Sequence, residues 1–138
     1  MDFSLDITKR IKDNRGSLVE VMRVHDIEKY ASSFGHIFYV TFDFPEVIRG
    51  NHYHKKQHEF YVLISGKICV VMEDVKTKKR KELILDADKN EVERLRVGPN
   101  IAHALYNISP KAVLLSYYSN PYNEHDNDTF HYTVHPQL

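Results

Sequence analysis

Two histidines separated by one residue, followed closely by a carboxylate, most constrain how this chain can fold. His52 and His54 stand at positions i and i+2, and Glu59 follows five residues after the second histidine. In an extended strand, alternate side chains project from the same face, so both imidazoles point to one side. A short turn through residues 55–57 would then begin a second strand in which Glu59 faces the same interior. The spacing therefore favours a β structure, because no helix gathers these side chains.

A second element lies downstream, where Pro99 is followed by His103 and then by Asn107. Antiparallel pairing of strands can bring its histidine to the first group. Three imidazoles and one carboxylate are a ligand set for a divalent transition metal, so zinc is expected, and iron, nickel and manganese also suit it. The expected metal ligands are His52, His54, Glu59 and His103. Metal-free catalysis by the same histidines is the alternative, because a coordinated imidazole has no lone pair left for a proton.

Composition and charge exclude several classes of protein. The 138 residues are 42% apolar and 28% charged, values typical of one globular domain. The formal net charge is zero, so the basic surface that nucleic-acid binding needs is absent from the sequence. No apolar run approaches the roughly 20 residues that span a bilayer, and the first residues do not resemble a signal peptide. We therefore expect a cytoplasmic protein with no nucleic-acid or membrane partner, in which the single Cys69 stays reduced.

Short β segments recur along the whole chain. Residues 36–44 are aromatic and β-branched up to Pro45, which predicts a strand, whereas residues 25–33 have the spacing of one short helix. The other predicted strands cover residues 17–23, 47–54, 59–65, 67–74, 81–85, 91–97, 102–108 and 112–119. Strands of this length and spacing are typical of an all-β sandwich or barrel. The polar end, with aromatics at Tyr122, Phe130 and Tyr132, is expected to pack across an outer face.

The two histidine elements match the signature of the cupins. The matching positions are His52, His54, Glu59, Gly66, Pro99, His103 and Asn107. This resemblance implies one cupin domain over residues 1–138, with a core of about residues 10–119 and a tail of residues 120–138. The implied fold is a small antiparallel β-barrel or jelly roll with at most one or two short helices.

A narrower resemblance covers most of the chain. Residues 13–20 are similar to the D-x-R-G-x-x-x-E element of deoxysugar-nucleotide epimerases, and residues 49–54 are similar to their R-G-x-H element. The second element also resembles that of sugar 3,4-ketoisomerases. The ending, Asn120-Pro121-Tyr122 and then residues 126–130, is similar to the C-terminal cupin of CapF-like enzymes of capsular polysaccharide synthesis. The resemblance implies an isomerase in surface-polysaccharide or deoxysugar biosynthesis, acting on a dTDP- or UDP-linked 4-keto-6-deoxyhexose.

The chemistry of such a substrate assigns roles to particular residues. A guanidinium offers a bidentate fork to phosphate oxygens, so Arg15 and Arg49 are expected to hold the pyrophosphate. The other expected substrate-binding residues are Asn51, His103 and Tyr117. The 4-keto group acidifies the C3–H bond, so a base can remove that proton and form an enediolate. Return of the proton to the opposite face of C3 inverts that carbon, which is the main expectation, whereas protonation at C4 moves the keto group.

The resemblance to the epimerases points to His52 as the base. Tyr61 follows Glu59 by two residues and should face the same interior, which makes it a candidate acid. If the histidines bind a metal instead, His58, Lys55 or a tyrosine would act as base. The expected catalytic residues are His52, His54, Tyr61, His58 and Lys55.

Two other classes of function remain open, a metal-dependent cupin oxygenase and a non-catalytic sugar-binding cupin. The arginines fit the oxygenase less well, and a binding protein would not need a base. We also expect a two-fold homodimer, because the sheet edges of short cupins need covering and two-fold symmetry is the commonest in oligomers.

Overall fold

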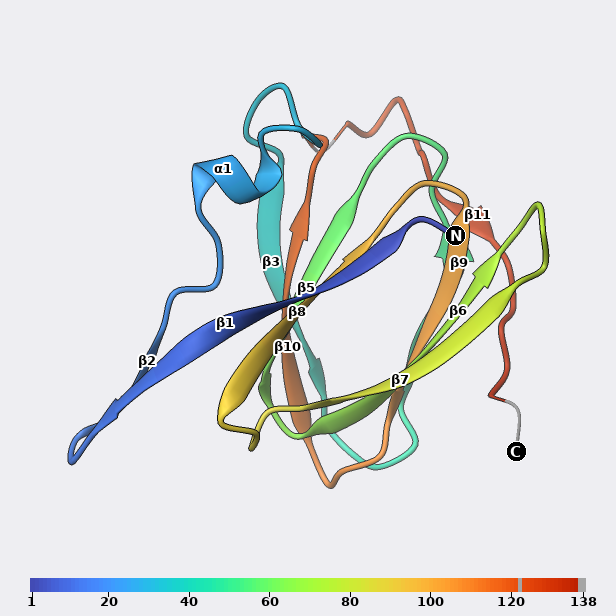
Figure 1. Cartoon of the computed structure of the whole chain (residues 1–138). Coiled ribbons are helices and arrows are strands. Elements are labelled where there is room, and N and C mark those ends of the chain that lie inside the picture. Colours follow the sequence, from blue (N-terminus) through green and yellow to red (C-terminus); the bar gives the residue numbers. More distant parts are fainter. Residues whose placement is uncertain (122, 137–138) are drawn as a thin grey trace.

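The computed structural model describes residues 1–121 and 123–136, so Tyr122 of the tail lies outside the described residues. Within these ranges the chain forms eleven β-strands and one short helix (Figure 1). The elements are β1 (Phe3–Asp13), β2 (Gly16–Val19), α1 (Val24–Ile27), β3 (His36–Phe42), β4 (Ile48–Tyr53), β5 (Glu59–Ser65), β6 (Lys67–Asp74), β7 (Arg80–Asp86), β8 (Glu91–Val97), β9 (Ile101–Asn107), β10 (Ala112–Tyr118) and β11 (Phe130–His131). The expected all-β fold is confirmed.

The strands form two antiparallel sheets that face each other. The six-stranded sheet has the order β2-β1-β8-β5-β10-β3, and the five-stranded sheet has the order β11-β4-β9-β6-β7. Because side chains alternate along each strand, one face of each sheet turns toward the other sheet and the opposite face turns outward. The space between the sheets is filled by a buried apolar core that includes Phe42, Leu63, Met72, Leu95 and Leu114. The histidine cluster lies on the same inner faces.

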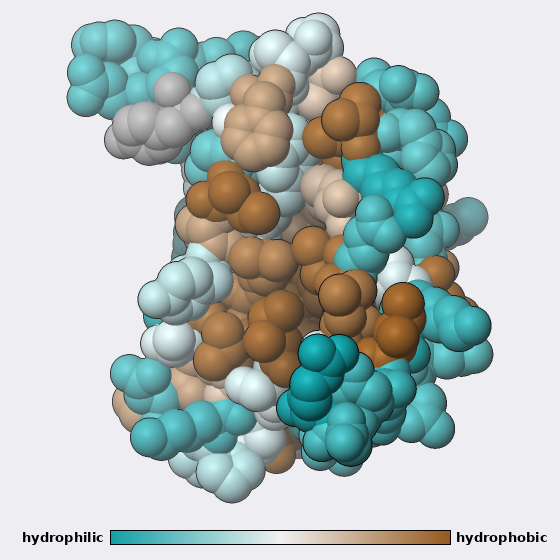
Figure 2. Space-filling model, turned by 90° about the vertical axis from the view of Figure 1, so that its left-hand side faces the viewer, coloured by the Kyte–Doolittle hydropathy of each residue, from teal (hydrophilic) through white to brown (hydrophobic). Residues whose placement is uncertain are grey.

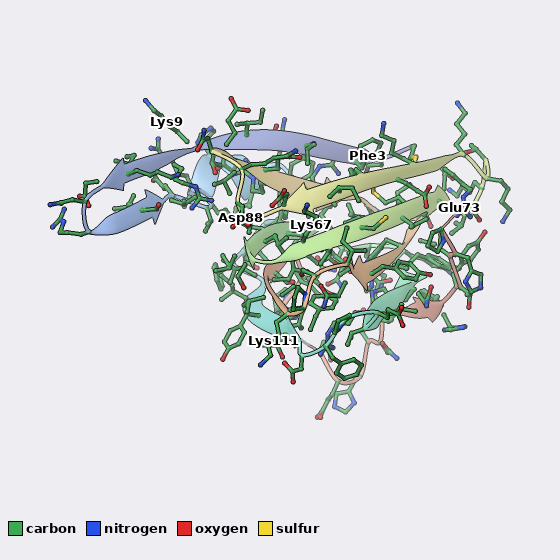
Figure 3. All side chains as sticks on the ribbon, turned by 90° about the horizontal axis from the view of Figure 1, so that it is seen from below. Phe3, Lys9, Lys67, Glu73, Asp88 and Lys111 are labelled. Atoms are coloured by element: carbon green, nitrogen blue, oxygen red, sulfur yellow. The ribbon has the colours of Figure 1, made fainter. Side chains whose placement is uncertain are left out.

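Strand β1, the first strand of the N-terminal hairpin, is the main element that the sequence analysis did not predict. Strand β1 pairs with β8 over its first part and with β2 over its last part. The hairpin of β1 and β2 projects beyond the body of the two sheets (Figures 1 and 3). Residues Phe3, Leu5 and Ile7 alternate with polar ones, so a period-two signal was present in the sequence.

Two predicted elements differ from the structure by more than two residues at one end. Strand β2 ends at Val19, short of the predicted residue 23, and helix α1 covers four residues where nine were predicted. Helix α1 buries no residue, so packing does not extend it. Asp26 anchors it instead, by accepting hydrogen bonds from Arg23 N and from Arg94 Nη1 at 2.7 and 3.1 Å.

The C-terminal segment covers the outer face of the five-stranded sheet, as expected. Strand β11 pairs with β4, and Val134 is buried in a second apolar cluster with Val71 and Ala102. Tyr132 packs against that cluster. The tail is therefore part of the folded structure, and it runs close to the strand that carries His52.

Candidate active site

A β-bulge in β4 aims the first histidine into the interior. Arg49 pairs with Leu105 of β9, and His52 pairs with His103, with a register shift between them. Arg49 and His52 are three residues apart and would face opposite sides of a regular strand, but the bulge places both on the inner face. Gly50 has φ +92°, and a Cβ there would lie 2.7 Å from the His103 carbonyl oxygen, so this position requires glycine.

Three imidazoles and one carboxylate meet between the two sheets. The donor atoms of His52, His54, Glu59 and His103 all lie within 4.8 Å of one another. Glu59 Oε2 lies 2.7 Å from His103 Nε2, and Glu59 Oε1 contacts His54 Nε2 and lies 3.8 Å from His52 Nε2. The Tyr61 hydroxyl donates to Glu59 Oε2. The structure thus gathers all four predicted ligands and one predicted catalytic tyrosine.

Exposure distinguishes the members of this histidine cluster. The side chains of His54, Glu59 and His103 are 3%, 1% and 1% exposed, whereas that of His52 is 24% exposed. His52 is therefore the member that a substrate can reach.

The cluster fits a divalent transition metal. Among the described residues, His52 Nε2, His54 Nε2 and Glu59 Oε1 are buried and make no hydrogen bond, although they face one another. His103 Nδ1 donates to the Ile101 carbonyl oxygen at 3.0 Å and His54 Nδ1 donates to that of Asp128 at 2.5 Å, so both rings turn Nε2 toward the carboxylate. Outer hydrogen bonds of this kind orient histidine ligands in metal sites. This cluster can bind a metal.

Burial and charge shift the pKa values in the cluster in different directions. Burial raises the pKa of Glu59, but the imidazoles, His103 foremost, outweigh that effect and hold the pKa well below its usual range. Burial and the Glu59 charge raise the pKa values of Tyr61 and Tyr118. Burial lowers the pKa of His54, but Glu59 and Asp128 outweigh it, so the pKa is raised. At neutral pH the carboxylate is thus ionised and both tyrosines keep their protons.

A cavity of about 830 Å³ adjoins the cluster. It lies between inner-face residues of β3 and β10 and the C-terminal segment, and its lining includes His36, Phe38, Gln57, Tyr118, Asp128 and Thr129. Tyr118 packs against His54 with ring centroids 5.6 Å apart, so the wall of the cavity touches the cluster. Volumes of this size are typical of sites for small organic ligands.

Tyr118 is the inner-face residue that the sequence analysis missed. The predicted substrate-binding residue was its neighbour Tyr117, which faces outward, packs against Phe34 and accepts a hydrogen bond from Gly35 N at 2.9 Å. Strand phase could have decided between the two tyrosines. Leu114 and Ser116 are both buried, and continuing their alternation places Tyr118 inside.

Four other predicted site residues do not point into this cluster. Arg15 lies at the tip of the projecting hairpin, where its 87% exposed side chain pairs with Asp13 at 2.6 Å. His58 faces outward, because it precedes the inward Glu59, and its ring packs at a tilt against that of Tyr30 and contacts Arg96 at 3.1 Å. Lys55 Nζ lies over the ring of Phe130 at 4.3 Å. Asn51 Oδ1 accepts from Val134 N at 2.9 Å, so this side chain holds the tail.

Arg49 reaches from β4 toward the edge of the other sheet. Its guanidinium donates to the Thr41 carbonyl oxygen through Nε and Nη2, at 3.1 and 2.9 Å, and lies 5.5 Å from the centre of the Phe42 ring. The side chain is exposed and shares the inner face with His52.

Comparison with known proteins decides the family. The model of the family described as "FdtA: WxcM-like, C-terminal" matches residues 1–135. The chain belongs to this family. The FdtA family match confirms the expected resemblance to cupins of nucleotide-sugar metabolism.

Individual proteins that are similar to this chain agree with the family assignment. A TDP-4-oxo-6-deoxy-α-D-glucose-3,4-oxoisomerase from Aneurinibacillus thermoaerophilus is 30% identical over 118 residues, which are 86% of this chain and 79% of that protein. A solved 3,4-ketoisomerase from Helicobacter canadensis superposes with a TM-score of 0.77 at 28% identity, over 94% of this chain and 90% of that one. The expected class of enzyme, an isomerase, is confirmed.

More distant structures share the fold. A dTDP-4-dehydrorhamnose 3,5-epimerase from Bacillus anthracis superposes with a TM-score of 0.77 at 21% identity, over 93% of this chain and 77% of that one.

Across residues 1–121 and 123–136, no helix has both the length and the apolar character needed to cross a membrane.

Proposed function

We propose that this protein is a sugar-nucleotide 3,4-ketoisomerase that acts on TDP-4-keto-6-deoxyglucose. The observation that carries the proposal is the 30% identity to a 3,4-oxoisomerase of that TDP-sugar over 86% of the chain. The inner-face histidine cluster beside a cavity supplies the chemistry that this reaction needs. Keto migration, given above as the alternative outcome, thus replaces C3 epimerisation as the favoured reaction.

The reaction is a proton transfer between neighbouring carbons. A base removes the C3 proton, and the electron pair moves through the C3–C4 bond to the carbonyl oxygen, which gives an enediolate. A proton is then delivered to C4, and the O3 proton moves to O4 as O3 becomes the new carbonyl oxygen. The reaction needs a base near neutral pKa and donors for the developing oxyanion.

His52 is the proposed base. It is the most exposed member of the cluster, and its Nε2, although buried, makes no hydrogen bond within the described part of the chain, which leaves a ring nitrogen to take up a proton. Glu59 lies 3.8 Å from that nitrogen and stabilises the imidazolium that forms. Tyr118, which lines the cavity and is protonated at neutral pH, is the proposed donor near the oxyanion, whereas Tyr61 already donates its hydroxyl proton to Glu59.

Arg49 is the proposed anchor for the pyrophosphate. Among the described residues its guanidinium donates, through Nε and Nη2, to one carbonyl oxygen only, and it lies on the inner face with His52. A planar fork with free N–H groups suits phosphate oxygens.

A bound metal would use the same atoms as the proposed base. His52, His54, Glu59 and His103 would hold a divalent transition metal such as Zn²⁺, which could polarise the sugar carbonyl as a Lewis acid. Coordination would occupy the lone pair of His52. Metal binding and base catalysis by this residue therefore compete.

We also propose that the protein is a homodimer that covers the outer face of its six-stranded sheet. Ile37, Tyr39 and Ile64 on that face are 54%, 69% and 53% exposed. Figure 2 shows apolar side chains gathered in the middle of this side, with hydrophilic ones around them. Strand β3 ends the sheet order, so its outer edge is open in the described residues. A contiguous apolar patch beside an open strand edge suits a second copy of the chain.

The test of the proposed activity is direct. The purified protein is incubated with TDP-4-keto-6-deoxyglucose and the product is followed by ¹³C NMR. We expect the carbonyl resonance of C4 to be replaced by one of C3, whereas an unchanged spectrum or inversion at C3 without keto migration would contradict the proposal.

A further inference from the structure

One residue of the C-terminal segment fixes the turn that follows His54. Asp128 Oδ1 accepts from Lys55 N at 2.9 Å, and Asp128 Oδ2 accepts from Lys56 N and Gln57 N at 3.0 and 3.1 Å. Three successive backbone N–H groups form a concave site for an anion. Here the carboxylate of the protein itself fills that site, from more than 70 residues downstream.

The main chain of the same residue orients His54. The Asp128 carbonyl oxygen lies 2.5 Å from His54 Nδ1, and Thr129 Oγ1 lies 3.5 Å from that nitrogen. A carbonyl oxygen can only accept, so Nδ1 carries the proton and Nε2 turns toward Glu59. The side chain of His54 is 3% exposed, so water has little room to replace this contact.

We propose that Asp128 is a positioning residue for the isomerisation, because its carboxylate fixes the segment whose carbonyl oxygen sets the orientation and tautomer of His54. The proposal rests on the proposed function. Asp128 acts through His54 and through the backbone, and it does not touch the reacting atoms. Asp128 contacts the turn after His54 and also lines the cavity, so a small displacement of the segment around Asp128 would move His54.

The neighbouring ion pair provides a matched control. Lys56 Nζ lies 3.0 Å from Asp126 Oδ2, and both side chains are more than half exposed. This pair joins the same two segments at the surface without contacting His54. Removing it by Lys56→Ala separates a general loosening of the tail from a specific effect on His54.

The experiment compares Asp128→Ala, Asp128→Asn and Lys56→Ala with the full-length wild-type protein. The histidine tautomers are read by ¹⁵N NMR, and kcat and KM are measured with TDP-4-keto-6-deoxyglucose. In Asp128→Ala we expect His54 to lose its single Nδ1–H tautomer and kcat to fall about ten- to hundredfold, with KM changed less than about threefold. Asp128→Asn keeps one acceptor oxygen, so its kcat should lie between those of Asp128→Ala and the wild type. Lys56→Ala should have the kcat and the His54 tautomer of the wild type.

A wild-type kcat in Asp128→Ala, or a lower kcat with the His54 tautomer unchanged, would overturn the proposal. If Asp128→Ala does not fold, the kcat and the His54 tautomer of the isosteric Asp128→Asn variant test the proposal in its place. If the wild-type protein does not convert the sugar nucleotide, the proposed function fails, whereas the NMR comparison still tests the orientation of His54.

Discussion

Glu59 and His103 join the two sheets through the interior of the barrel. Glu59 begins β5 of the six-stranded sheet, His103 lies in β9 of the five-stranded sheet, and Glu59 Oε2 lies 2.7 Å from His103 Nε2. The carboxylate is fully buried and also accepts from Tyr61. It therefore contributes both to the proposed chemistry and to the packing of one sheet on the other.

Glu59→Gln should impair both activity and stability. The substitution keeps the shape but removes the charge that faces the imidazoles, and hydrogen bonds to charged groups contribute about 1.5–3 kcal/mol. We expect the free energy of unfolding, measured by urea denaturation, to fall by about 2 kcal/mol. Glu20→Gln is the control, because Glu20 pairs with Arg23 at the surface with 56% of its side chain exposed. Equal stability of both variants would show that the cluster is not held by this charge.

Arg49→Ala should weaken substrate binding without unfolding the protein. Loss of a charge-assisted hydrogen bond of about 1.5–3 kcal/mol predicts a rise in KM of roughly ten- to hundredfold, with little change in kcat. Arg23→Ala, which removes an equal charge from the exposed pair with Glu20, is the control. A KM equal to that of the wild type would remove Arg49 from the binding site.

Zinc should inhibit the enzyme. The cluster offers donors that suit Zn²⁺, but coordination would occupy the lone pair with which His52 accepts the C3 proton. We expect activity to survive treatment with a chelator and to fall as Zn²⁺ is added, with binding followed separately by calorimetry. Activity that disappears with the chelator and returns with the metal would assign the histidines as ligands of a required cofactor.

Tyr39→Asp should disrupt the proposed dimer. Tyr39 is 69% exposed in the apolar outer face of the six-stranded sheet, where a buried carboxylate would be costly. Light scattering at micromolar concentration should give twice the chain mass for the wild type and the chain mass for the variant. A wild-type protein that is monomeric at this concentration would rule out the assembly.

The histidine cluster could be predicted from the sequence because the spacing of its residues within each short segment is itself informative. A two-residue period in a strand puts His52 and His54 on one face, and the structure adds Glu59 and His103 as expected. The bulge at Gly50 and Asn51 was not predicted, because it shows only as a register shift against another strand. That bulge also brings Arg49 to the face of His52.

Several predicted site residues lie away from the cluster, for reasons that depend on strand phase and on pairing between distant strands. His58 and Tyr117 were chosen by residue type, but each lies one position out of phase with the inner face and packs outward. Arg15 matched a motif, but the hairpin that carries it projects from the body, which depends on how β1 pairs with β8. The contacts of Asp128 join residues more than 70 positions apart, so no local pattern contains them.

The most direct test of the proposed reaction is incubation of the wild-type protein with TDP-4-keto-6-deoxyglucose in deuterated water, followed by NMR of the product. Proton removal from C3 and delivery to C4 predict a 3-keto sugar that carries solvent deuterium at C4. A recovered 4-keto sugar with deuterium and inverted configuration at C3 would instead show an epimerase, and a substrate recovered without deuterium would contradict isomerisation altogether.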